Sequence, residues 1–123
     1  MMRKGERRSF KNIQDGWWTD GERRIYMRSS WEKKYADRLN ILKMAGEIKD
    51  WEYEPDTFWF EAIKRGVRSY KPDFKVIYKD GSVQYHEVKG FLDAKSQTKL
   101  KRMAKYYPDI KIVVITGDRL KGL

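Results

Sequence analysis

The stretch KPDFKVIYKDGSVQYHEVK, residues 71–89, decides the fold of this chain. Two strand-like segments, Asp73–Tyr78 and Val83–Lys89, lie on either side of Asp80-Gly81, a dipeptide typical of the turn in a β-hairpin. Both segments are rich in β-branched and aromatic residues, which favour strands. We therefore expect an antiparallel hairpin within a larger sheet.

The register of this hairpin decides whether Asp73 shares a face with Glu87 and Lys89. Glu87 and Lys89 are two residues apart, so they project from the same face of their strand. A two-residue turn would pair Asp73 with Val88, and the Asp73 side chain would point away from Glu87. A three-residue loop, residues 79–81, would pair Asp73 with Glu87 and would end on a glycine that can adopt the left-handed conformation. The sequence permits both registers.

Periodic segments on both sides of the hairpin predict a single α/β domain with a mixed central sheet flanked by helices. The pattern Ser29-x-x-Glu32 is a capping box, and apolar residues follow it at helical spacing. A strand, a helix and a strand end the chain as a crossover unit, so these two strands should be parallel. The expected order is a helix from Ser29, strands at Ile48–Tyr53, Thr57–Ile63, Asp73–Tyr78 and Val83–Lys89, a helix at Ala94–Tyr106, and a strand at Ile110–Ile115.

Residues 1–28 differ from residues 29–123 because neither a helical nor a strand period holds there. They carry many arginines and lysines together with the pair Trp17-Trp18. We expect a basic N-terminal arm followed by the folded domain. Basic residues with interleaved aromatic residues suit a nucleic-acid backbone and stacking on exposed bases. Alternatively, the aromatic residues pin the arm to the core or to a second subunit.

The composition favours a polyanionic partner. The formal net charge is +10 over 123 residues, and a basic surface gains free energy from counterion release when it binds nucleic acid. The alternative is that the charge serves solubility alone. The chain has no cysteine, which excludes disulfides and thiolate metal sites, and its longest purely apolar run, Ile112–Ile115, is too short to span a bilayer. We expect an intracellular, cytoplasmic protein that does not bind membranes.

A shared face for Asp73, Glu87 and Lys89 would place two carboxylates and an ammonium group at one end of the sheet. Carboxylate oxygens suit Mg²⁺, which keeps several water ligands and accepts phosphate oxygens from a substrate. The ammonium group can position an attacking water or stabilise developing negative charge. The alternative is a surface Glu–Lys pair together with an aspartate that merely begins a strand after Pro72.

The pattern Pro72-Asp73, followed after thirteen residues by Glu87-Val88-Lys89, resembles the PD-(D/E)xK signature of the restriction-endonuclease-like nuclease superfamily. The expected order of elements is similar to the α-β-β-β-α-β core of that superfamily. The resemblance implies an Mg²⁺-dependent endonuclease, with Mn²⁺ able to substitute. The implied catalytic residues are Glu32, Asp73, Glu87 and Lys89, and the implied metal ligands are Asp73, Glu87, the backbone carbonyl of Val88, and Glu32 from the first helix.

Within that superfamily, the small size and basic charge resemble small phage-type Holliday junction resolvases, which implies a homodimer that cuts branched DNA. A related phage-type nuclease acting on duplex, nicked or recombination-intermediate DNA is the first alternative. A non-catalytic nucleic-acid-binding module is the second. The basic residues that we expect to contact DNA phosphates, or otherwise to form solvated surfaces, are Arg65, Arg68, Lys71, Lys95, Lys99, Arg102 and Lys105.

The only histidine, His86, is expected on the face opposite Glu87, since the two are neighbours on one strand. We therefore interpret it as a residue of the core layer or of an interface. A role as the catalytic base would require it on the same face as the carboxylates.

Overall fold

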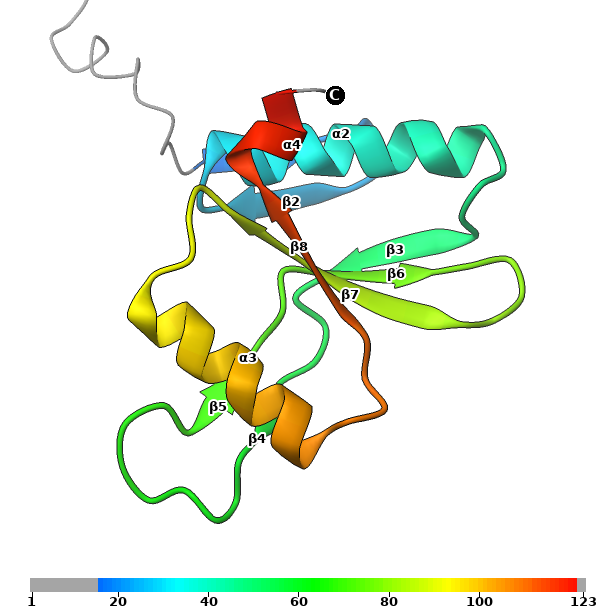
Figure 1. Cartoon of the computed structure of the whole chain (residues 1–123). Helices are drawn as coiled ribbons and strands as arrows, with labels where there is room; N and C mark the ends of the chain where they lie inside the picture. Colours follow the sequence, from blue (N-terminus) through cyan, green and yellow to red (C-terminus); the bar gives the residue numbers. More distant parts are fainter. Residues whose placement is uncertain (1–15, 122–123) are drawn as a thin grey trace, which may run out of the picture.

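A four-stranded mixed sheet forms the centre of the computed structural model, which describes residues 16–121 (Figure 1). Strand β6 pairs antiparallel with both β3 and β7, and β7 pairs parallel with β8. The predicted α/β class, the mixed sheet and the parallel final pair are confirmed. The strands, in their order across the sheet, are β3 (Asp50–Tyr53), β6 (Phe74–Ile77), β7 (Val83–Lys89) and β8 (Ile112–Thr116).

Side-chain caps fix where the two long helices begin. Ser29 caps α2 (Ser30–Met44), and its hydroxyl accepts a hydrogen bond from the Glu32 amide at 3.1 Å. Asp93 caps α3 (Ala94–Tyr106) in the same way, and the predicted bounds of this helix are confirmed. A short helix not expected from the sequence, α4 (Gly117–Lys121), follows β8. Among the described residues, none of the helices is long and apolar enough to cross a membrane.

Two apolar cores lie on opposite faces of the sheet. The first packs α2 and α4 against the sheet, and the second lies between α3 and a small two-stranded sheet formed by β4 (Phe58–Trp59) and β5 (Ser69–Tyr70) (Figure 1). Because both faces are covered, four consecutive residues of β7 are buried. The main members of the first core are Leu39, Trp51, Phe74, Val76, Val88 and Ile115, and those of the second are Phe60, Tyr70 and Met103.

The predicted strand Thr57–Ile63 is wrong for most of its length. Only Phe58–Trp59 is a strand, and the chain then turns back in a loop so that the Phe60 amide donates to the Arg68 carbonyl at 2.9 Å. The aromatic richness of this region reflects packing in the second core and not a longer strand. Trp51 and Phe60 are buried, whereas Trp59 is 54% exposed.

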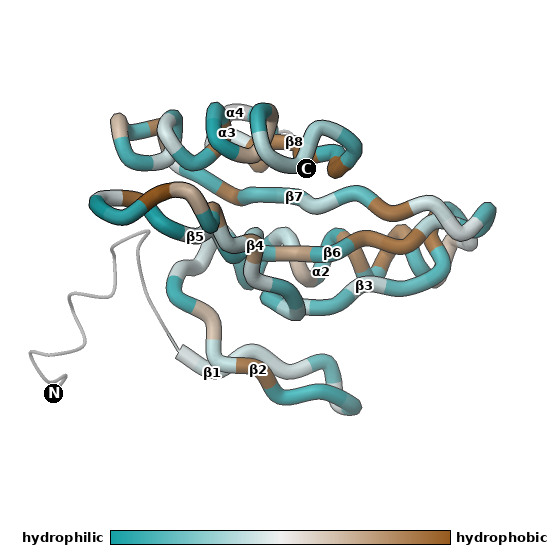
Figure 2. Tube along the Cα trace, turned by 90° about the horizontal axis from the view of Figure 1, so that it is seen from below, coloured by the Kyte–Doolittle hydropathy of each residue, from teal (hydrophilic) through white to brown (hydrophobic). Residues whose placement is uncertain are grey.

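The expectation that residues 1–28 lack regular structure is wrong for residues 16–27. Strands β1 (Gly16–Thr19) and β2 (Arg24–Met27) form a hairpin beside β3, on the side of the sheet away from β8 (Figure 2). Trp18 and Met27 are buried in the first core, so the hairpin is pinned to the domain. Four residues a strand are too few to show an alternating pattern, which is why the sequence did not reveal it. Residues 1–15 of the expected arm lie outside the described residues.

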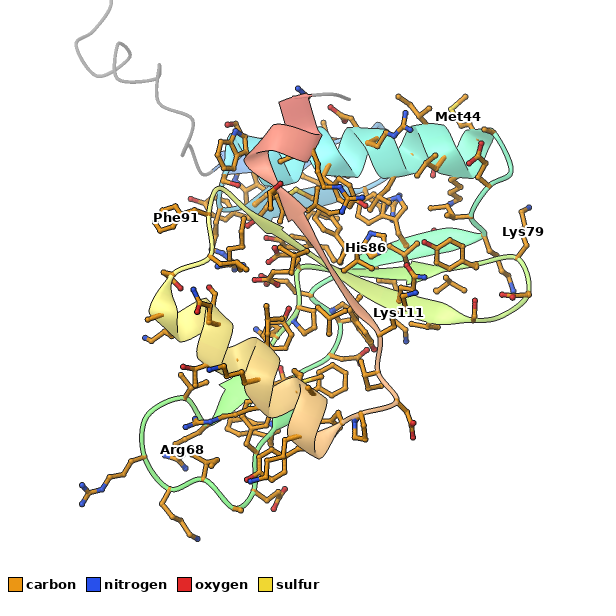
Figure 3. All side chains as sticks on the ribbon, viewed as in Figure 1. Met44, Arg68, Lys79, His86, Phe91 and Lys111 are labelled. Atoms are coloured by element: carbon orange, nitrogen blue, oxygen red, sulfur yellow. The ribbon has the colours of Figure 1, made fainter. Side chains whose placement is uncertain are left out.

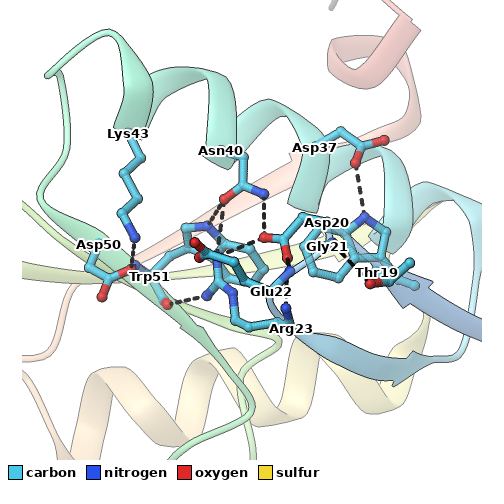
Figure 4. A network of polar contacts seen from close by, with 11 residues as sticks. Thr19, Asp20, Gly21, Glu22, Arg23, Asp37, Asn40, Lys43, Asp50 and Trp51 are labelled. Carbon is cyan, nitrogen blue, oxygen red and sulfur yellow. Dashed lines mark hydrogen bonds and ion pairs between the residues drawn. The ribbon is translucent and has the colours of Figure 1, made fainter.

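A polar network holds this hairpin against α2 and β3 (Figure 4). The Asn40 side-chain oxygen accepts hydrogen bonds from the Trp51 indole at 2.8 Å and from the Arg23 guanidinium at 3.0 Å. The Asn40 amide group donates to Asp20 at 2.8 Å. Arg23 also lies over the Trp51 ring, 3.9 Å from the ring centroid. One amide thus joins the hairpin turn, the helix and the first strand of the central sheet.

Replacement of Asn40 by alanine is expected to lower the free energy of unfolding by about 2–4 kcal/mol, because it leaves the Trp51 indole N–H without an acceptor and releases the hairpin turn. Urea unfolding followed by tryptophan fluorescence measures this. Lys43→Ala on the same helix is the control, since it removes only an exposed pair with Asp50 and should cost less than about 1 kcal/mol. Equal effects of the two substitutions would show that the network does not hold the hairpin.

Candidate active site at the end of the sheet

The β6–β7 hairpin adopts the register that places Asp73 opposite Glu87. Phe74 pairs with His86, and the Tyr78 amide donates to the Ser82 carbonyl at 2.9 Å. The connecting loop therefore has three residues, and its last one, Gly81, has φ +91°, where a side chain would be strained. Of the two registers that the sequence permits, the structure has the one that the metal-site hypothesis requires.

The end of β3, the beginning of β6 and the end of β7 meet at one edge of the sheet, beside the first turn of α2. A pocket of about 400 Å³ opens there. Its lining combines acidic residues from four separate segments with lysines from β7, α3 and the segment before β6. The lining residues are Arg28, Glu32, Glu54, Ser69, Lys71, Asp73, Glu87, Val88, Lys89 and Lys99.

Asp73 lies at the base of the pocket, and only 4% of the residue is exposed. One carboxylate oxygen, Oδ2, accepts a hydrogen bond from the Val88 amide at 2.8 Å. The other, Oδ1, lies 3.4 Å from the Arg28 guanidinium. Burial raises the pKa of Asp73 well above its usual range, and the nearby charges of Glu87 and Glu32 raise it further. The fold therefore holds a carboxylate where the charged form is costly without a cation.

Glu87 is buried beside Asp73 and is held by neutral donors on one side and by a lysine on the other. Its Oε1 accepts hydrogen bonds from the Tyr70 hydroxyl at 2.9 Å and from the Asp73 amide at 3.3 Å. Its Oε2 lies 3.6 Å from the Lys89 ammonium group. Burial raises the pKa of Glu87, while the Tyr70 hydrogen bond and the Lys89 charge oppose that shift. Tyr70 has a raised pKa, chiefly from burial, so it stays a protonated donor.

Glu54 and Arg28 belong to the site, and the sequence interpretation assigned neither of them to it. The Arg28 guanidinium forms ion pairs with Glu54, with Asp73 and, at 3.9 Å, with Glu32. Glu54 has φ +49°, a left-handed conformation that is uncommon for a residue with a side chain. Its amide donates to the Asp73 carbonyl at 2.8 Å, which continues the β3–β6 pairing beyond Tyr53. Knowledge of that pairing would have placed Glu54 opposite Asp73.

Glu32, the expected fourth acidic residue, is buried at the beginning of α2 and lines the pocket. Its Oε1 accepts hydrogen bonds from the Tyr53 hydroxyl at 2.5 Å and from the Arg28 amide at 3.3 Å. Of the two hydrogen bonds of a capping box, only the one from the Glu32 amide to the Ser29 hydroxyl therefore forms. The Glu32 carboxylate bonds to the Arg28 amide and not to that of Ser29. Glu32 combines a helix-capping position with a place in the site.

The donor chemistry fits a hard divalent cation, although no three His, Cys, Asp or Glu side chains in residues 16–121 are already arranged to enclose one. The pocket offers carboxylate oxygens, which Mg²⁺ and Mn²⁺ prefer over nitrogen or sulfur. Two of these oxygens, Asp73 Oδ1 and Glu87 Oε2, contact the cationic groups Arg28 and Lys89. Each of these two oxygens is thus already paired with a positively charged side chain.

Comparison with known proteins gives a family without an assigned role. A family model described as "Protein of unknown function (DUF1064)" matches residues 22–121. The chain belongs to this family. No curated protein and no solved structure matches the chain. The DUF1064 match begins within the β1–β2 hairpin and includes every residue that lines the pocket, so the site lies wholly within the family domain.

The DUF1064 domain brings some of the predicted DNA-binding residues to the pocket and leaves others away from it. Lys71 and Lys99 line the pocket together with Lys89. Arg68 lines a different hollow beside Trp59 and Phe60, and the Arg102 guanidinium donates to the Val67 carbonyl, which ties α3 to the β4–β5 loop. The remaining predicted residues are exposed and line none of the pockets described here: Arg65 in that loop, and Lys95 and Lys105 on α3.

His86 lies on the opposite face of β7, between the DUF1064 sheet and α2 (Figure 3). Its Nδ1 is 2.6 Å from the Tyr35 hydroxyl in a buried contact. Burial lowers the pKa of His86 to about 4, so the ring is neutral at physiological pH. The interpretation of His86 as a core-layer residue is confirmed.

Gly90 and Gly117 allow the Trp31 ring to pack against the ends of β7 and β8. A Cβ on Gly90 would lie 2.3 Å from a Trp31 ring atom, which no real packing tolerates. We expect Gly90→Ala to lower the free energy of unfolding by about 1–3 kcal/mol through overpacking. Thermal and urea unfolding measure the loss. In a Trp31→Phe background the same substitution should cost less, and an unchanged cost would show that the ring is not the obstacle.

Proposed function

We propose that this DUF1064 protein is a metal-dependent DNA endonuclease of the PD-(D/E)xK type. The observation that carries the proposal is the hairpin register, which places Asp73 opposite Glu87 and on the same face as Lys89. The order α2, β3, β6, β7, α3, β8 supports it, because it corresponds to the helix, three antiparallel strands, helix and strand of that superfamily. The lysines in the pocket lining and the net charge of +10 supply affinity for a polyanion.

The metal would be held by Asp73, Glu87 and the backbone carbonyl of Val88, with Glu32 close by. When bound, Mg²⁺ or Mn²⁺ supplies a Lewis acid that polarises the scissile phosphate and lowers the pKa of a water molecule. The protein contributes fixed positions for these ligands. The Val88 amide orients the Asp73 carboxylate, and the Tyr70 hydroxyl orients that of Glu87.

Lys89 is the residue that we assign to the reacting phosphate. Its ammonium group is 3.6 Å from Glu87 Oε2 and is partly exposed to the pocket. From there it orients the attacking water and stabilises the charge that develops on the phosphate oxygens. Lys71 and Lys99 lie on the pocket wall and bind neighbouring phosphates of the same strand, which places one phosphodiester at the carboxylates.

Branched DNA, and in particular the four-way junction, is the substrate that we propose. A basic surface on one small domain favours recognition of backbone geometry over base sequence, because phosphate contacts carry no sequence information. Symmetric cutting of a junction requires two active sites, so the proposal includes a homodimer. Another DNA substrate for the same catalytic site is the alternative within the nuclease class.

Cleavage of a labelled four-way junction, compared with matched duplex, nicked and single-stranded DNA, tests this function. Each DNA is incubated with the full chain in Mg²⁺ and in EDTA. We expect paired, symmetric, Mg²⁺-dependent cuts in the junction. Equal cutting of all DNAs would keep the nuclease and remove the junction. Binding without cleavage of any DNA in Mg²⁺ or Mn²⁺ would instead support a non-catalytic nucleic-acid-binding module.

A further inference from the structure

Arg28 is the cation that contacts three of the four carboxylates in the pocket lining. Its guanidinium forms ion pairs with Glu54, with Asp73 Oδ1 at 3.4 Å and with Glu32 Oε2 at 3.9 Å. The three carboxylates come from different parts of the fold, and this one side chain joins them. Burial disfavours the charged guanidinium, but the hydrogen bond with Glu54 and the electrostatic interactions with Tyr53, Glu32 and Glu54 outweigh it and raise the pKa of Arg28.

The Asp73 oxygen that Arg28 contacts is the one that a metal would need. Asp73 Oδ2 already uses one of its lone pairs for the Val88 amide, so Oδ1, which Arg28 contacts, is the oxygen with more capacity for a cation. A guanidinium nitrogen and a divalent ion cannot both contact that oxygen at close range without strong repulsion between their charges. Binding of one cation therefore opposes binding of the other.

The Arg28 side chain lines the pocket with 57% of its surface exposed, so core packing does not hold the guanidinium in place. Its backbone is anchored, since the Arg28 amide donates to Glu32 at 3.3 Å. Glu54, its closest partner, has φ +49°, a left-handed backbone conformation that is uncommon for a residue with a side chain and is often found at functional sites. The guanidinium can therefore leave Asp73 while the ion pair with Glu54 holds it near the site.

We propose that Arg28 is the internal counter-cation of this site, which neutralises Asp73 in the metal-free chain and competes with a divalent cation for the same oxygen. The inference rests on the proposed metal site and adds the residue that sets its affinity. Arg28 keeps the buried acidic site folded when no metal is bound. Every metal ion that binds must displace the guanidinium from Asp73, which lowers the affinity of the site for the metal.

Titration of the full chain with Mn²⁺, with free Mn²⁺ measured by electron paramagnetic resonance, tests the competition without any need for DNA or cleavage. We expect Arg28→Ala and Arg28→Gln to bind Mn²⁺ about tenfold more tightly than the wild type, the order expected for loss of one partly exposed charge contact. Lys43→Ala, which removes a positive charge at the other end of α2, should leave the affinity unchanged. Asp73→Asn should abolish binding at the site.

Thermal unfolding supplies the second measurement. Without metal, Arg28→Ala should melt below the wild type, because three carboxylates lose their shared cation, and saturating Mn²⁺ should raise its melting temperature more than that of the wild type. Unchanged or weaker Mn²⁺ binding in both Arg28 variants, with Asp73→Asn still abolishing it, would overturn the competition and leave the metal site standing. Mn²⁺ binding that ignores Asp73→Asn would overturn the metal site itself, and this inference with it.

Discussion

Asp73→Asn is expected to lower the rate of the proposed metal-dependent DNA cleavage by about a thousandfold or more, since it replaces a charged carboxylate, our proposed metal ligand, with a neutral amide. The same substitution should not weaken folding. Burial and the charges of Glu87 and Glu32 raise the pKa of Asp73, which means that the folded chain disfavours its charged form. A neutral residue of equal size removes that cost, so resistance to urea at neutral pH should rise or stay the same. Initial cleavage rates and urea unfolding of one preparation measure both effects.

Asp80→Asn is the matched control for this prediction, because Asp80 lies in the turn of the same hairpin, exposed and remote from the pocket. Its cleavage rate should equal that of the wild type. If the Asp73→Asn protein were inactive because it is unfolded, Asp73 would have a structural role and not a catalytic one. If it kept full activity, the proposed metal site would be wrong.

Lys89→Ala is expected to lower the single-turnover rate of cleavage by about a hundredfold with little change in DNA affinity, because in the proposed mechanism the ammonium group acts on charge that develops during the reaction. Lys89→Arg should recover part of the rate, since it keeps the charge but not the compact shape. Single-turnover kinetics in Mg²⁺ give the rate, and binding of the same DNA in EDTA gives the affinity.

Lys79→Ala, which removes an exposed lysine from the turn of the hairpin, controls for the loss of positive charge and should change neither quantity. A Lys89→Ala protein that binds DNA more weakly but cuts bound DNA at the normal rate would assign Lys89 to phosphate binding alone. In that case Asp73 and Glu87 would remain the proposed metal ligands, and another group in the pocket would orient the water.

Local signals predicted the helices and the hairpin because those elements depend on nearby residues. The Asp93 cap and the proline at 108 determine α3, and both are visible in the sequence. The register was left open because two loop lengths fit the turn residues equally well. The apolar pattern favours one of them: Phe74 and Val76 must share a face with Val88 to pack against α2, and only the three-residue loop achieves this.

The parts that the sequence did not reveal depend on contacts between distant segments. Glu54 enters the site through the pairing of β3 with β6, and its left-handed backbone has no signal in the residue type. Arg28 enters because β2 packs against the domain and ends beside the beginning of α2. The hairpin that precedes Arg28 was missed because each of its four-residue strands has only one buried position. Glu32, Asp73 and Glu87 were thus named from a motif, whereas Glu54 and the cation Arg28 were not.

The three-residue loop between β6 and β7 also governs the order in which charges assemble as the chain folds. Asp73 and Glu87 are 14 residues apart and meet when the hairpin forms, an event of about 1–10 μs in small hairpins. Arg28 is 45 residues from Asp73, and its arrival requires the closure of a larger loop and the docking of a helix. The nascent hairpin, with Lys89 as the cation beside Glu87, therefore brings two negative charges together before Arg28 arrives. Added salt and a lower pH both weaken that repulsion. They should consequently change the rate of the earliest steps of folding.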